Sequence, residues 1–114
     1  MQLNRQDFGD AMVITVGEPR IDAAVAIQFK DRLRELTGNG PDRVVLDLGQ
    51  VGFLDSSGLG AVVAALKQLG PGRTLELAAL TPTVEKVFRL TRMDTVFTIH
   101  PDADHAIGDM WQAS

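Results

Sequence analysis

The chain contains no cysteine among its 114 residues. Disulfide bonds, thiolate metal sites and cysteine nucleophiles are therefore excluded. Histidine is also scarce, because only His100 and His105 are present, and neither has the spacing of a paired metal ligand. We therefore expect no metal site and no cofactor.

Long apolar runs and basic clusters are absent as well. The longest apolar run, from Leu59 to Leu66, is far shorter than the roughly 20 residues that span a bilayer. The first seven residues lack the apolar core of a signal peptide. The net charge is −4 with scattered lysines and arginines, whereas nucleic-acid binders carry a basic stripe. We expect a cytoplasmic protein with no membrane insertion and no direct nucleic-acid contact.

The residues that are present have the composition of a folded domain. Hydrophobic residues make up 45% of the chain and charged residues 23%, close to globular averages. The length predicts a single domain, residues 1–114, with one hydrophobic core.

Apolar spacing between the glycines and prolines predicts an alternation of strands and helices. The expected order is ββαβαβαβα, which makes an α/β fold with a mostly parallel central sheet of four to five strands and about four helices. We expect the first strand to pair antiparallel at an edge. The expected strands are 3–8, 11–16, 44–48, 75–79 and 96–99, and the expected helices follow Asp22, Asp55, Thr81 and Pro101.

Two helix starts carry capping signals. The carboxylate of Asp22 can accept hydrogen bonds from free amides of the first turn, which is the role of an N-cap. Thr81 followed by Pro82 offers a capping hydroxyl and then a proline in the first turn.

A polar motif lies where the expected buried strand 44–48 leads into a helix. This edge of an α/β sheet is the usual place for a functional site. The two glycines of the motif each cost roughly 0.5–1 kcal/mol in a helix interior, which predicts a close approach to the backbone there. The motif is Asp55-Ser56-Ser57-Gly58-Leu59-Gly60.

The serines of this motif have two interpretations. Either a serine only caps the helix, or it accepts a phosphate, which the amides and dipole of a helix N-terminus would stabilise. A phosphoserine carries about −1.5 to −2 charges at neutral pH. Because the helix terminus tolerates that charge, phosphorylation should act on a partner rather than unfold the domain.

The motif and the strand before it resemble the central motif of STAS domains and, more narrowly, of bacterial anti-sigma factor antagonists. The residues that carry the resemblance are Val44-Val45-Leu46-Asp47-Leu48, then Val51, Phe53, Leu54 and the motif that begins at Asp55. The resemblance extends over nearly the whole chain and implies a STAS fold.

The resemblance also implies a non-enzymatic mechanism. Such antagonists bind an anti-sigma factor, often a GHKL-type serine kinase, and thereby release a sigma factor. The kinase phosphorylates the serine directly after the motif aspartate, here Ser56, with Ser57 as the second candidate acceptor. A phosphatase restores the active form. The implied partner-binding residues are Asp22, Asp55, Ser56, Ser57, Gly58, Leu59 and Gly60.

One segment departs from the family pattern. Family members carry Gly-x-Leu-Asp after the second strand, with the aspartate at the partner interface. Here the segment is Gly17-Glu18-Pro19-Arg20-Ile21-Asp22, so Ile21-Asp22 matches Leu-Asp after about two inserted residues.

Two other functions remain open. The chain could be a STAS subunit of a lipid-transport complex or of a stressosome-like assembly, and a lipid-transport subunit does not require a phosphorylatable serine. A small serine hydrolase is the third possibility, although the motif is not the Gly-x-Ser-x-Gly elbow of that class. A hydrolase would need His100 or His105 beside Ser56.

Overall fold

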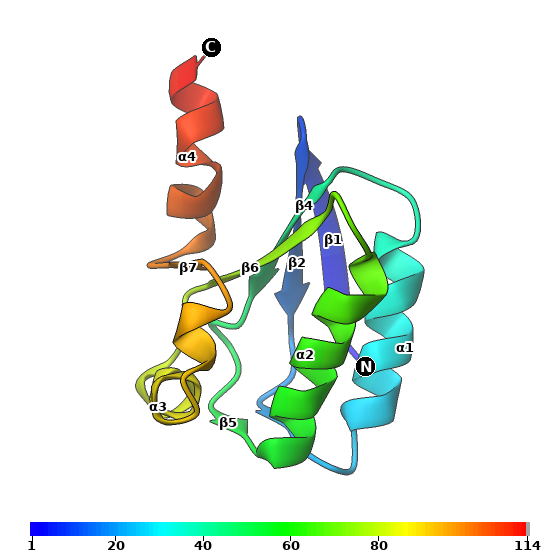
Figure 1. Ribbon diagram of the computed structural model, residues 1–114, viewed down its shortest axis with the longest axis vertical. Coiled ribbons are helices and arrows are strands. Elements are labelled where there is room, and N and C mark those ends of the chain that lie inside the picture. Colours follow the sequence, from blue (N-terminus) through cyan, green and yellow to red (C-terminus); the bar gives the residue numbers. More distant parts are fainter. Residues whose placement is uncertain (114) are drawn as a thin grey trace.

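The computed structural model describes the backbone of residues 1–113 and the side chains of residues 1–108. Figure 1 shows an α/β fold in which helices lie on both sides of a twisted sheet. The elements are β1 (Leu3–Phe8), β2 (Ala11–Val16), β3 (Arg20–Ile21), α1 (Ala26–Thr37), β4 (Arg43–Asp47), β5 (Phe53–Leu54), α2 (Ser56–Leu69), β6 (Thr74–Ala78), α3 (Pro82–Leu90), the 3₁₀ turn η1 (Met93–Thr95), β7 (Ile99–His100) and α4 (Ala103–Ala113).

The main sheet has five strands in the order β1-β2-β4-β6-β7. The β1 strand pairs antiparallel with β2 at the edge, and the remaining pairs are parallel. The central strand β4 is buried on both faces, since Val44, Val45 and Leu46 are each 0% exposed. The predicted fold class, the edge strand and the buried central strand are therefore confirmed.

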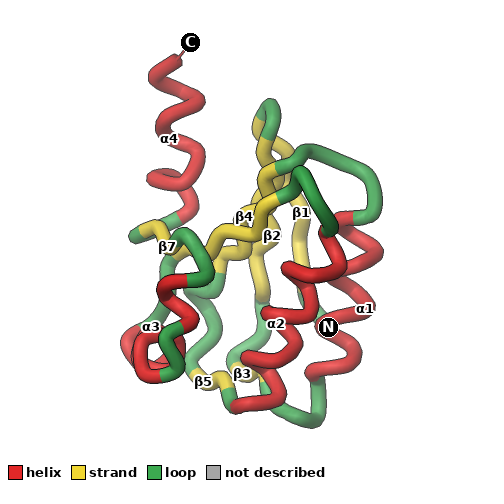
Figure 2. The backbone as a smooth tube through the Cα atoms, in the orientation of Figure 1, coloured by secondary structure: helices red, strands yellow, loops and turns green. Residues whose placement is uncertain are grey.

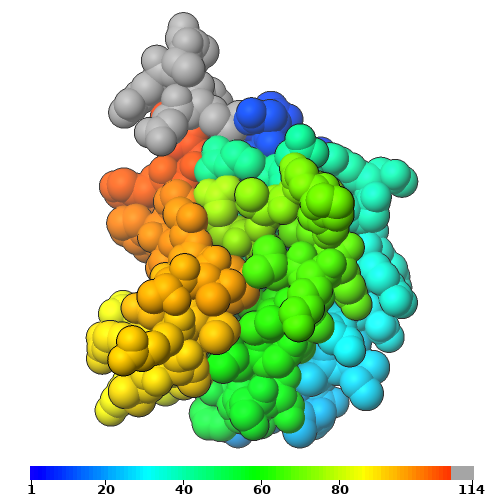
Figure 3. Space-filling view, viewed as in Figure 1, coloured from blue at the N-terminus to red at the C-terminus, as the bar shows by residue number. Residues whose placement is uncertain are grey.

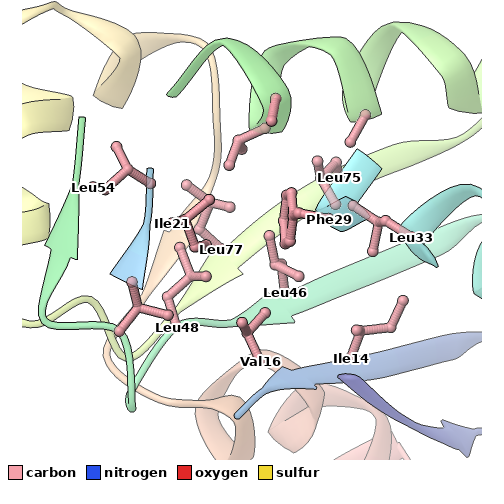
Figure 4. Close-up of a cluster of buried hydrophobic side chains, with 14 of the residues drawn as sticks. Ile14, Val16, Ile21, Phe29, Leu33, Leu46, Leu48, Leu54, Leu75 and Leu77 are labelled. Carbon is pink, nitrogen blue, oxygen red and sulfur yellow. The ribbon is translucent and has the colours of Figure 1, made fainter. Parts of the chain in front are cut away.

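Side-chain alternation along the strands divides the interior into two layers. One face of the sheet packs against α1 and α2, which lie side by side in Figure 1, and its core includes Phe29 and Leu33 of α1. Figure 4 shows these side chains meeting leucines of β4 and β6. On the other face, Val13, Val45 and Ala78 pack against α4.

The C-terminal third differs from the prediction in two details. The last strand is the short β7, which begins only at Ile99, because the chain continues from η1 into a turn that leaves Val96 51% exposed. Helix α3 begins at Pro82 as predicted, but the Thr81 hydroxyl makes no capping hydrogen bond. It donates instead to the carbonyl of Val51, at 2.8 Å, and so ties the start of α3 to the loop before β5.

A second, two-stranded sheet was not predicted. Strands β3 and β5 pair in parallel, with Arg20 opposite Phe53 and Ile21 opposite Leu54. Figure 2 shows this pair at the lower end of the molecule, directly beside the start of α2. Ile21 and Leu54 point into the core, as Figure 4 shows, so the small sheet is anchored by apolar burial.

Candidate functional site

The segment that departs from the family pattern forms one side of the candidate site. The carbonyl of Pro19 accepts hydrogen bonds from the amides of Gly52, at 2.9 Å, and Phe53, at 3.3 Å. The residues around Pro19 thus continue the pairing of β3 with β5. They hold Arg20 and Asp22 beside the start of α2, so the insertion is part of the site.

Asp55 is the N-cap of α2 and links two parts of the site. Its Oδ1 accepts a hydrogen bond from the amide of Gly58 at 2.9 Å, and its Oδ2 accepts one from the amide of Ala23 at 3.3 Å. The interpretation that a serine caps this helix is therefore wrong. Asp, Ser and Asn are all good N-caps, and here the first of three capping-type residues takes the position.

Ser56 and Ser57 are the first two residues of α2, and both are exposed. Among the residues whose side chains the structure describes, neither hydroxyl makes a hydrogen bond. They stand at the positive end of the helix dipole, where a phosphate is favoured. The structure thus leaves both hydroxyls accessible to a modifying enzyme.

Asp22 was predicted to cap α1, but it does not. The helix begins at Ala26, after a turn in which the Asp22 carbonyl accepts the amide of Val25, at 3.1 Å. The Asp22 carboxylate instead accepts the amide of Ala24, at 3.1 Å, and pairs with Arg20 across 3.3 Å. The half-buried carboxylate is therefore fixed beside α2 by its own loop.

An aromatic and a guanidinium group, whose contact the sequence did not predict, complete this side of the site. The Cζ atom of Arg20 lies 4.4 Å from the centroid of the Phe53 ring, in cation–π geometry. Phe53 is 37% exposed, and it stands two residues before Asp55. Their position opposite each other in the β3–β5 pair could not be found without knowing that this pair forms.

The two glycines of the motif have different roles. Gly58 is buried, and a Cβ atom there would overlap the carbonyl oxygen of Ile21. The predicted close approach is therefore an internal one, made by β3. A Cβ on Gly60 would meet nothing within 4 Å, so the fold does not require a glycine at that position. Between them, Leu59 is half-buried and packs against the main core.

The two histidines bond to carboxylates elsewhere in the molecule. His100 Nε2 lies 2.7 Å from Glu76 Oε1, and His105 Nδ1 lies 2.7 Å from Asp102 Oδ1. Neither imidazole bonds to a serine of the motif, so the contact that a hydrolase would need is not made. Among the residues described, no three His, Asp or Glu side chains gather in a way that could hold a metal ion.

Glu76 is the centre of a polar network that the sequence did not reveal. Its carboxylate accepts two hydrogen bonds from Arg43, both at 2.7 Å, and contacts His100. Burial raises the pKa of Glu76, but the hydrogen bonds from Arg43 and His100 outweigh it and lower the pKa below its ordinary value. Arg43 also donates to the carbonyl of Ala106, at 2.9 Å, so the network joins the sheet to α4.

The fold and the site together define a small α/β domain with two exposed serines at a helix start. The STAS domain family matches residues 2–106, and the chain therefore belongs to this family. It is 33% identical over 91 residues to the protein BtrV of Bordetella bronchiseptica, whose name describes an anti-sigma factor antagonist. That match covers 79% of this chain and 78% of BtrV.

Solved structures share the fold over nearly the whole chain. An anti-sigma factor antagonist from Mycobacterium paratuberculosis is 26% identical, with a TM-score of 0.84 over 95% of this chain and 92% of that one. The antagonist SpoIIAA in its unphosphorylated form is 21% identical, with a TM-score of 0.75 over 97% of each chain. The murine anion transporter Slc26a9 is 17% identical, with a TM-score of 0.79 over 96% of this chain but only 19% of the transporter.

These relationships make the chain a non-enzymatic regulatory protein. In the part of the chain that the structure describes, no helix is long and apolar enough to cross a membrane.

Proposed function

We propose that the chain acts in the cytoplasm as a single STAS domain, residues 1–114, and is an anti-sigma factor antagonist. It binds an anti-sigma factor, a sigma factor is released, and phosphorylation of Ser56 ends the binding. The names of BtrV and of the Mycobacterium paratuberculosis protein support the antagonist role. The observation that carries the switch is the exposed Ser56 at the start of α2, where Asp55 already serves as the cap.

The proposed partner surface contains the exposed and half-exposed residues around the start of α2. Asp22, Ser56, Ser57 and Gly60 are accessible there, and the half-buried Asp55 joins the two loops. Gly58 and Leu59 support this surface from the interior. Gly58 lets β3 approach α2, and Leu59 fixes α2 on the core. A phosphate on Ser56 would add bulk and negative charge beside two carboxylates, which opposes docking.

The proposed partner is an anti-sigma factor that is itself a GHKL-type serine kinase. A bound kinase can reach Ser56 because the hydroxyl is exposed, and a separate phosphatase removes the phosphate. Ser57 is the alternative acceptor. In agreement with this scheme, the fold of SpoIIAA is known in both an unphosphorylated and a phosphorylated form, the latter from Bacillus.

A second candidate is a STAS subunit of a transport or stressosome-like assembly without a phospho-switch. The likeness to one part of the Slc26a9 anion transporter favours it. The neighbouring genes separate the two candidates, since a GHKL-type kinase gene supports the first and transporter genes the second.

The deciding experiment is phosphorylation in vitro. The purified chain is incubated with ATP and, in turn, with each GHKL-type kinase encoded in the genome that carries it, and phosphate is mapped by mass spectrometry. We expect one phosphate on Ser56, lost in Ser56→Ala and kept in Ser57→Ala. Absence of phosphate from both serines would refute the switch.

The Ser56→Asp variant tests how the switch acts. It is expected to weaken binding to the kinase while leaving the midpoint of thermal unfolding nearly unchanged, because an acidic group is favoured in the first turn of a helix. If Ser56→Asp instead unfolds the domain, the switch does not act through the partner.

A further inference from the structure

A shallow hollow of roughly 160 Å³ lies between α1 and α2, beside the proposed switch. We propose that this α1–α2 hollow receives an apolar side chain of the anti-sigma factor, and that a carboxylate next to that side chain pairs with Lys30. The inference rests on the proposed function and adds the chemistry that the partner must present. The hollow is lined by Ala26, Ile27, Lys30, Ser57, Gly60 and Ala61.

Gly60 is the first observation that points to an occupant. Neither packing nor backbone conformation requires a glycine here, since a Cβ would meet nothing within 4 Å and Gly60 has no positive φ. In a helix interior, glycine is less favourable than alanine. Because glycine has no side chain, the hollow stays open on the α2 side.

The rim of the hollow combines an exposed apolar side chain with a cation. Ile27 is 71% exposed, and Lys30 follows it one turn later on α1. The neighbouring charges of this helix are paired, Asp31 with Arg34 and Arg32 with Glu35. Within the described residues Lys30 makes no ion pair. An apolar residue beside an aspartate or glutamate is the complementary feature on a partner.

The hollow is continuous with the proposed switch because Ser57 belongs to both. A phosphate on the adjacent Ser56 places negative charge beside the hollow and repels the carboxylate that Lys30 would bind. Phosphorylation would thus act on one specific contact of the interface, the pairing of Lys30 with the partner's carboxylate.

The test measures binding of the unphosphorylated chain to the GHKL-type kinases of the same genome by titration calorimetry. Three variants alter the hollow: Gly60→Leu fills it, Ile27→Asp makes its rim polar and Lys30→Glu reverses its charge. Two matched controls lie on α3, where Leu90 is 70% exposed and Lys86 stands one turn before it. The controls are Leu90→Asp and Lys86→Glu, and circular dichroism confirms that every variant is folded.

Each hollow variant is expected to raise Kd about tenfold or more, as changes at central interface positions do, while the controls stay within about twofold of wild type. Lys30→Gln is expected to flatten the dependence of Kd on salt concentration. If wild type binds but the hollow variants bind equally well, the hollow is not the docking point and the proposed function stands. If wild type binds none of the kinases, the proposed function fails and this inference fails with it.

Discussion

Replacing each of the two glycines of α2 by alanine is expected to change the stability of the domain in opposite directions. In Gly58→Ala, the new Cβ would overlap the Ile21 carbonyl oxygen and lie 2.9 Å from its carbonyl carbon, so β3 or α2 must shift. Overpacking of this kind costs about 1–3 kcal/mol, more than the gain in helix propensity. In Gly60→Ala the Cβ enters open space, and the expected change is a gain of about 0.5–1 kcal/mol.

The measurement is equilibrium unfolding in urea, followed by circular dichroism, on both variants and wild type. The two variants should differ by roughly 1.5–3 kcal/mol with unchanged m-values, taking a net loss of about 1–2 kcal/mol at Gly58 and a gain of about 0.5–1 kcal/mol at Gly60. Both variants introduce the same methyl group in the same helix, so general effects on α2 cancel. A Gly58→Ala variant as stable as Gly60→Ala would refute the packing of β3 against α2.

Two further predictions concern charged groups. Asp55→Ala should lose about 1–2 kcal/mol as the N-cap of α2 is removed, whereas Asp55→Asn should lose much less because asparagine also caps, and urea unfolding of both variants checks this. Acidification should destabilise wild type more than Glu76→Gln: with its pKa lowered in the folded state, the Glu76 contribution is complete above roughly pH 4.3, the ordinary glutamate value, and is lost as the pH falls through the folded pKa. The free energies of unfolding of wild type and Glu76→Gln should therefore converge as the pH falls from neutral to acid. If they remain a constant amount apart, the network with Arg43 and His100 does not hold that charge.

The order of the main-sheet strands and the helices was predictable because apolar spacing reports local geometry. Phe29 and Leu33 mark the buried face of α1, and the continuous run around Val45 marks a strand covered on both sides. Both signals depend only on residues close together in the chain. They locate the place where the central strand leads into α2, and so they also locate the candidate site.

The details of the site were less predictable because they depend on contacts between distant segments. The pairing of Arg20 with Phe53 joins two loops, and neither loop has enough regular alternation to indicate a strand. The same pairing brings Ile21 against Gly58, which explains the glycine without any partner. Choosing the cap among Asp55 and the serines was equally ambiguous, since all are favoured at that position.

The identity of the cap determines how a phosphate at this site can act. If Ser56 had capped α2, phosphorylation would have replaced a structural hydrogen bond and coupled the switch to the stability of the helix. Because the Asp55 carboxylate holds both Gly58 and the loop at Ala23, modification of Ser56 breaks no hydrogen bond that the structure shows. The added charge then remains at the exposed start of α2, next to Ser57, which lines the α1–α2 hollow. The proposed switch would therefore change what the domain can bind while the domain itself stays folded.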